Sequence, residues 1–80
     1  MNNEIYEKVK AILVENLKVS ADEITPESEL VNDLGINSLE LADLVFSCED
    51  AFEIEIDDKS LGSFKTVADV VTYLDEITNA

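Results

Sequence analysis

The residue best placed to take part in chemistry is Ser38, within the stretch DLGINSLE that spans residues 33–40. Its hydroxyl follows Asn37 and stands three residues after Gly35, where a helical pattern of apolar residues begins. A nucleophilic serine needs an adjacent base and a site for an oxyanion, and the chain has no histidine to act as that base. No motif places any of the five basic residues beside Ser38. A hydroxyl without its own base is better suited to being modified by another enzyme.

The simpler interpretation of Ser38 is that it only helps to start a helix, where serine is a common residue. Asn37 is a favoured N-cap, and Glu40 follows three residues later, as in a capping box. A helix is therefore predicted from about Ser38 to Phe52. Taken by itself, the serine fits this interpretation better than a chemical one, so the choice depends on what surrounds it.

The predicted helix has apolar residues on two opposite sides. At about 100° per residue, one side collects the residues of a core stripe, namely Leu41, Leu44, Val45, Cys48, Ala51 and Phe52. The opposite side carries two apolar residues with carboxylates around them: Leu39 and Phe46, with Asp43, Asp50 and Glu53. Single exposed apolar residues are ordinary on protein surfaces. Two of them within a ring of carboxylates favour a face that docks a partner protein.

Two further amphipathic helices flank this one. A helix from about residue 3 to 17 is predicted by apolar residues at helical spacing, namely Ile5, Val9, Ile12, Leu13 and Leu17. A last helix is predicted after the N-cap pair Thr66 and Asp69, with the stripe Val67, Val70, Val71, Leu74 and Ile77. Asp57-Asp58 is expected to start a short helix that ends near Gly62. The prediction is an all-α fold, a small antiparallel bundle of three main helices plus one short helix, in a single domain over residues 1–80.

A long loop is expected between the first two helices, from Lys18 to Ile36. It contains many turn-forming residues and no sustained hydrophobic period, and a structureless loop of this length is unusual in a compact domain. Its isolated apolar residues are predicted to anchor it across the helices: Val19, Ile24, Leu30, Val31, Leu34 and Ile36. Thr25-Pro26 is a candidate for one extra helical turn, with threonine as the cap and proline first.

The charge balance excludes several classes of partner. The chain has 80 residues, of which 19 are acidic and 5 basic, so its net charge is −14 at pH 7. This charge repels phosphate backbones and anionic lipid, so we expect neither nucleic acid binding nor membrane insertion. The same charge favours partners with basic protein surfaces. The single cysteine favours a reducing compartment, and no segment has the apolar length of a signal peptide or a bilayer span. We therefore expect a cytoplasmic monomer.

The whole chain resembles the acyl carrier protein family. Residues Asp33-Leu34-Gly35-Ile36-Asn37-Ser38-Leu39-Glu40 are similar to the family signature D-L-G-x-D-S-L followed by an acidic residue. The length, the helix order, the long first loop, the acidity and the ending T-V-x-D-V-V-x-Y-L over residues 66–74 agree with that family too. The sequence departs from the signature at one position, because Asn37 stands where the family usually has aspartate.

The resemblance implies a carrier and not an enzyme. Ser38 would bear a 4′-phosphopantetheine, added from coenzyme A by a phosphopantetheinyl transferase, and the thiol of this arm would hold acyl groups as thioesters. Acyl-processing enzymes of fatty acid or related lipid biosynthesis would dock through basic patches onto Asn37, Leu39, Glu40, Asp43, Phe46, Glu49 and Asp50. The acyl chain would enter the core among Leu44, Cys48, Ile56, Leu61, Phe64 and Val70.

Several alternatives stay open from the sequence. The cargo can instead be a D-alanyl, aminoacyl or polyketide unit, and an unmodified acidic interaction module is a further candidate. Because Asn37 is neutral, three explanations stay open. Glu40 and Asp43 can suffice for recognition of the site by partner enzymes, the carrier can serve a specialised set of enzymes, or it is modified poorly. No metal site is predicted, because Cys48 has no histidine or second cysteine to accompany it, and residues 53–58 (EIEIDD) lack the spacing of a calcium loop. Cys48 is expected to be a buried packing residue.

Overall fold

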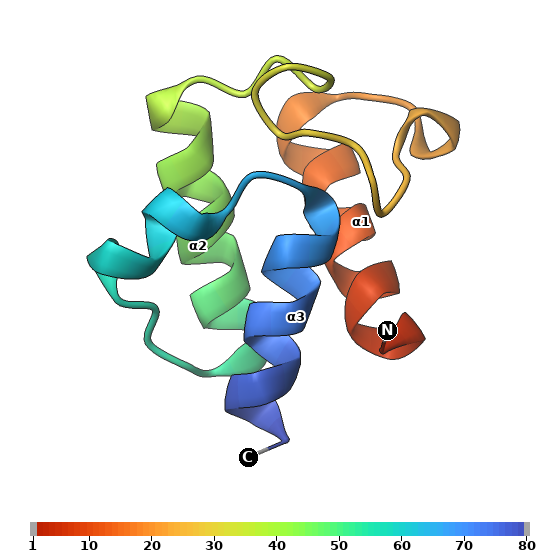
Figure 1. Cartoon of the computed structure of the whole chain (residues 1–80). Coiled ribbons are helices and arrows are strands. Elements are labelled where there is room, and N and C mark those ends of the chain that lie inside the picture. Colours follow the sequence, from red (N-terminus) through yellow and green to blue (C-terminus); the bar gives the residue numbers. More distant parts are fainter. Residues whose placement is uncertain (1, 80) are drawn as a thin grey trace.

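Residues 2–79, which the computed structural model describes, form three α-helices and two short 3-10 helices. In chain order these are α1 (Asn3–Leu17), η1 (Ala21–Glu23), α2 (Ser38–Phe52), η2 (Asp58–Ser63) and α3 (Val67–Thr78). Figure 1 shows that α1 runs opposite to α2 and α3, which both begin at the end of the molecule that the long loop crosses. The predicted all-α fold, with its long loop between the first two main helices, is confirmed.

The α-helices begin at side chains that accept hydrogen bonds from their first N–H groups. The Asn2 Oδ1 atom accepts from the backbone nitrogens of Glu4 and Ile5 at 3.1 and 3.2 Å. Both predicted capping boxes are present, Asn37 with Glu40 at α2 and Thr66 with Asp69 at α3. Such a cap stabilises a helix by about 1 kcal/mol, and these residue types are therefore preferred where helices begin. This preference is why the starts of α2 and α3 could be predicted from the sequence.

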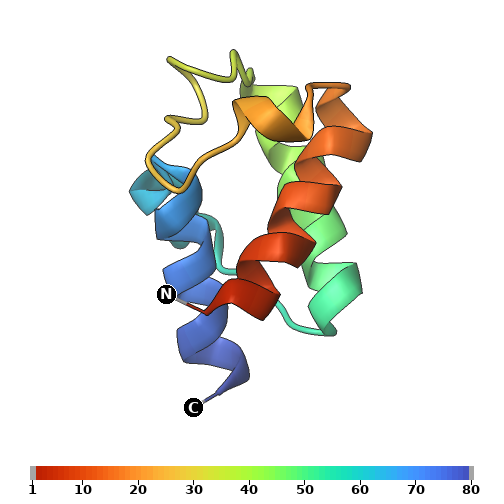
Figure 2. The same cartoon turned by 90° about the vertical axis from the view of Figure 1, so that its right-hand side faces the viewer.

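The core lies between the three helices, and Figures 1 and 2 show them from two sides. Each contributes most of the stripe predicted for it, with Ile5, Val9 and Leu13 from α1, Leu44, Val45 and Cys48 from α2, and Val67, Val70, Val71 and Leu74 from α3 all buried. The other predicted stripe residues besides Ala51 are half-buried, namely Ile12, Leu17, Leu41, Phe52 and Ile77. The backbone of α1 approaches those of α2 and α3 more closely than these two approach each other. Side chains of the segment between α2 and α3, including Ile56 and Phe64, complete the core there.

One predicted core residue is wrong. Ala51 was expected on the buried side of α2, and it is exposed. On the helix it lies at the edge of the apolar stripe, about 80° from the stripe's centre, and it belongs to the last turn. A small side chain at the edge of a stripe gains little from burial, so the helix can leave it in solvent.

The long loop is held by backbone hydrogen bonds to the start of α3. The Val67 and Ala68 nitrogens donate to the carbonyl oxygens of Ser28 and Pro26 at 3.0 and 2.9 Å. The Leu30 nitrogen donates to the Lys65 carbonyl oxygen at 2.9 Å. The first N–H groups of a helix have no acceptors within that helix, so these loop carbonyls satisfy donors that α3 cannot satisfy itself.

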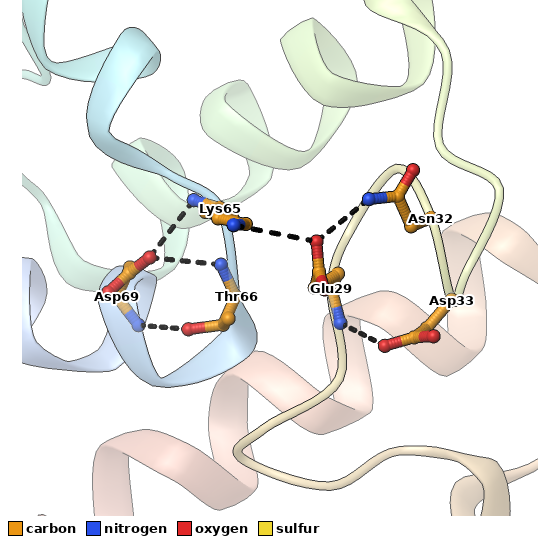
Figure 3. Close-up of polar contacts among 6 residues, drawn as sticks. All are labelled: Glu29, Asn32, Asp33, Lys65, Thr66 and Asp69. Atoms are coloured by element: carbon orange, nitrogen blue, oxygen red, sulfur yellow. Dashed lines mark hydrogen bonds and ion pairs between the residues drawn. The ribbon is translucent and has the colours of Figure 1, made fainter.

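Polar side chains reinforce the contact between this loop and α3 (Figure 3). The Asp69 Oδ2 atom accepts hydrogen bonds from the nitrogens of Lys65 and Thr66 at 3.1 and 3.0 Å. On the loop side, Asp33 Oδ2 accepts from the Glu29 nitrogen at 2.7 Å. The Lys65 ammonium lies 4.0 Å from the Glu29 carboxylate, but 75% of the lysine side chain is exposed, so this ion pair contributes little. The backbone hydrogen bonds therefore provide most of the attachment.

Five of the six predicted anchors pack the loop against the core. Ile24, Leu30 and Ile36 are buried, and Val19 and Leu34 are half-buried against the same cluster. The sixth prediction, Val31, is wrong, since 62% of this residue is exposed. It follows the buried Leu30 directly and its carbonyl oxygen accepts from the Gly35 nitrogen in a tight turn, so its side chain is left on the outside.

The extra helical turn in the loop lies four residues before the predicted place. It is η1, where the Ser20 side chain accepts a hydrogen bond from the Asp22 nitrogen at 3.4 Å. Thr25-Pro26 forms a non-helical turn, closed by a hydrogen bond from the Ser28 nitrogen to the Thr25 carbonyl oxygen. The buried Ser28 hydroxyl accepts from the Thr25 nitrogen at 3.0 Å, which reinforces this turn.

Candidate functional site

Ser38 is the first residue of α2, and its side chain is exposed. The Asn37 Oδ1 atom accepts a hydrogen bond from the Glu40 nitrogen at 2.8 Å, and Glu40 Oε1 accepts from the Asn37 nitrogen at 3.1 Å. These reciprocal bonds span Ser38 and fix the backbone on both sides of it. Within residues 2–79 the Ser38 hydroxyl has no hydrogen-bond partner, so it is available to an incoming enzyme.

The chain that leads to Ser38 is fixed by the loop and α3. Gly35 has φ of 69°, a left-handed conformation that glycine adopts without steric cost. The next residue, Ile36, is buried, and its nitrogen donates to the Leu30 carbonyl oxygen at 2.9 Å. Since Leu30 is itself bonded to Lys65 just before α3, a short series of backbone hydrogen bonds connects the start of α3 to the segment before Ser38.

The outward side of α2 carries the apolar residues that the sequence placed there. Leu39 is 79% exposed and Phe46 is 67% exposed, and Asp43 and Asp50 are exposed on the same helix. Leu39 and Phe46 are seven residues apart, which places them two turns, or about 10 Å, along one side. This arrangement of apolar side chains and carboxylates, together with Ser38 at one end of the helix, forms a surface suited to a basic partner.

A shallow, open hollow adjoins the C-terminal half of α2, lined by Phe46, Glu49, Asp50, Ile54 and Glu55. Two apolar side chains and three carboxylates suit a long basic side chain from a partner. Its carbon atoms can pack on the apolar side chains, and its charged group can approach the carboxylates. Ile54 and Glu55 were missing from the residues predicted to dock, because they follow the helix and its periodicity does not reach them. The alternating sequence EIEI over residues 53–56 is the signal that could have identified them.

Glu49 has a structural role besides facing this hollow. Its side chain is half-buried, and Oε2 accepts a hydrogen bond from the Ile56 nitrogen at 2.7 Å. The Glu49 carbonyl oxygen also accepts from the Ile54 nitrogen at 3.1 Å. Glu49 therefore holds the segment that leaves α2 and brings Ile56 into the core.

The six residues predicted to surround an acyl chain come from α2, the segment after it and α3. Five of them, Leu44, Cys48, Ile56, Phe64 and Val70, are buried in one apolar cluster, and Leu61 is half-buried against it. The Phe64 ring meets the Tyr73 ring edge to face, with 5.2 Å between the ring centroids. These residues come from α2, α3 and the segment between them, and the backbones of these two helices approach each other less closely than either approaches α1.

Cys48 is 1% exposed within this cluster. Burial, and to a smaller extent the charge of Glu49, raises the pKa of its thiol from 9.0 to about 12. The thiolate is the nucleophilic form of cysteine, so at neutral pH Cys48 is chemically inert. This agrees with the expected packing role of Cys48.

The comparisons with known proteins identify the family of this chain. The family model for the phosphopantetheine attachment site matches residues 7–74. Acyl carrier proteins of three strains of Clostridium perfringens (SM101, ATCC 13124 and 13) are each 43% identical to this chain over 74 residues, which are 92% of this chain and 97% of theirs. The chain therefore belongs to the acyl carrier protein family, whose members are non-catalytic carriers with a site for phosphopantetheine.

The residues around Ser38 fit this prosthetic group. The exposed hydroxyl can form a phosphodiester, and the N-terminal end of α2 beside it carries a partial positive charge that favours a phosphate.

Among residues 2–79, no helix is long and apolar enough to cross a membrane.

We expect ionisation of Cys48 to lower stability at alkaline pH. The unfolded thiol loses its proton near pH 9, whereas the folded one keeps it until about pH 12, so the stability present below pH 9 is lost as the pH rises toward 12. Between pH 8 and pH 10 this loss is about 1.4 kcal/mol of unfolding free energy. Urea denaturation at both pH values tests it, with Cys48→Ala as the control that keeps the tyrosines and lysines. Equal losses in the two proteins would contradict the prediction.

Proposed function

We propose that the protein holds acyl intermediates as thioesters on a 4′-phosphopantetheine arm attached to Ser38, and delivers them to enzymes of fatty acid or related lipid biosynthesis. The observation that carries the proposal is the exposed Ser38 hydroxyl, which has no partner within residues 2–79 and stands at the fixed start of α2. Membership of a family with a phosphopantetheine attachment site supports it.

In the proposed attachment, this chain and the transferase contribute different groups at Ser38. During attachment, Ser38 Oγ would bond to the phosphorus of coenzyme A that carries pantetheine, and the phosphorus–oxygen bond to the adenosine part would break. The proton of the hydroxyl needs an acceptor, and within residues 2–79 no carboxylate or other base is hydrogen-bonded to the Ser38 hydroxyl. In this proposal the transferase supplies the base, while this chain contributes a positioned hydroxyl and the N-terminal end of α2 beside the phosphate.

The interior favours an apolar cargo. Leu44, Ile56, Phe64 and Val70 present only carbon atoms to a chain that enters among them, and Cys48 is un-ionised there. A D-alanyl or aminoacyl group carries an ammonium, which would be buried without an acceptor among these residues. An acyl chain is the cargo that this part of the core can shelter.

The partners in this proposal are the transferase and successive acyl-processing enzymes with basic patches. Leu39 and Phe46 would fill apolar depressions on those enzymes, and Asp43 and Asp50 would meet their lysines and arginines. Contacts between exposed charges are weak and screened by salt, which suits a carrier that must leave one enzyme for the next. A cytoplasmic location belongs to the proposal, because the single cysteine favours a reducing compartment.

Incubation with coenzyme A and a broad-specificity phosphopantetheinyl transferase tests the attachment. The intact mass is expected to rise by one phosphopantetheine for the natural sequence and to stay unchanged for Ser38→Ala. Ser63→Ala, which removes another exposed serine hydroxyl, is the matched control and should gain the same mass as the natural sequence. A mass gain that persists in Ser38→Ala would refute the assignment.

Reversing one charge on α2 tests the docking face. Asp43→Lys is expected to lower kcat/KM of the transferase about tenfold at low salt, and much less at about 0.5 M salt, because the lost attraction is screened there. Glu7→Lys on α1 changes the net charge equally at an exposed position outside α2, and should have a small effect. If both substitutions lower kcat/KM by the same factor, net charge and not this face determines recognition.

A further inference from the structure

The side chain next to Ser38 presents a hydrogen-bond donor to an incoming enzyme. The Asn37 Oδ1 atom is the acceptor for the Glu40 nitrogen at 2.8 Å, which identifies the other side-chain atom as Nδ2. Asn37 is exposed, and within residues 2–79 its Nδ2 makes no hydrogen bond. An aspartate in the same cap would instead present a second, negatively charged oxygen, which is an acceptor.

The residues directly beside Ser38 in the chain are uncharged. The neighbours Asn37 and Leu39 are neutral, and the half-buried Glu40 directs Oε1 to the Asn37 nitrogen at 3.1 Å. The first fully exposed carboxylate on α2 is Asp43, five residues or about 7.5 Å along the helix. The attachment site therefore differs in chemistry from the acidic face beyond it.

We propose that Asn37 determines which transferase modifies this carrier, and that the group facing it on that enzyme is an uncharged acceptor, such as a backbone carbonyl or a side-chain amide oxygen. This inference rests on the proposed attachment at Ser38. Lysine and arginine offer donors only, so neither can pair with Nδ2. A carboxylate could accept from Nδ2, but the field of a chain with net charge −14 repels it.

Two substitutions test separately the hydrogen-bond donor at Asn37 and the effect of a negative charge at that position. Asn37→Asp keeps the cap and replaces the donor by a charged acceptor, whereas Asn37→Ser keeps an uncharged cap oxygen and replaces the amide by a shorter hydroxyl, whose donor does not reach the position of Nδ2. Asparagine, aspartate and serine are comparable N-caps, so both variants should fold, which thermal melts by circular dichroism verify. The kcat/KM for transfer from coenzyme A is then measured for three carriers with two enzymes, the transferase encoded by the same genome and one whose natural carriers have aspartate before the serine.

The expected result is a reversal of preference between the two enzymes. With the first enzyme, both variants should be modified about tenfold more slowly than the natural sequence, because its acceptor loses its partner. With the second enzyme, Asn37→Asp should be modified about tenfold faster than the natural sequence, and Asn37→Ser should lie between them. The same order of rates with both enzymes, or equal rates for the three carriers, would overturn the inference. If no carrier gains mass with either enzyme, the attachment at Ser38 itself is refuted, and this inference with it.

Discussion

The first N–H groups of α3 have no acceptors within their own helix. The long loop supplies these acceptors, and the rest of the structure is arranged around that loop. The carbonyl oxygens of Pro26 and Ser28 accept these bonds, and this fixes a loop that has no periodic structure of its own. Leu30 and Ile36 continue the hydrogen bonding to the residues just before Ser38. The position of the candidate attachment site thus depends on a helix that begins almost thirty residues later, and not only on the cap of α2.

Carrier function makes two opposing demands on this small core. Leu44 and Val70 are buried, and under the proposed function this part of the core would have to open for an acyl chain without unfolding. The arrangement of the helices reconciles them, because α1 packs closely on both partners while α2 and α3 lie farther apart. The segment that completes the core between those two helices is held partly by one carboxylate, that of Glu49, which accepts from the Ile56 nitrogen at 2.7 Å.

The sequence was sufficient for features that depend on neighbouring residues and insufficient for those that depend on tertiary contacts. Helical periodicity and the caps at Asn37 and Thr66 predicted the helices and their starts, and the exposed positions of Leu39 and Phe46 followed from the same geometry. The exposed position of Val31 could not be predicted, because it depends on how the loop docks onto α3. The same holds for Glu49, whose bond to Ile56 forms only when the chain turns back after α2.

The central claim is that the hydroxyl of Ser38 carries the arm, and locating the added mass tests it most directly. After modification by the transferase, cleavage at Glu29 and Glu40 releases residues 30–40, in which Ser38 is the sole hydroxyl-bearing residue. Tandem mass spectrometry of this peptide is predicted to show one phosphopantetheine on it and none on any other peptide. An unmodified 30–40 peptide, with the added mass on a peptide that contains another serine, would contradict the account.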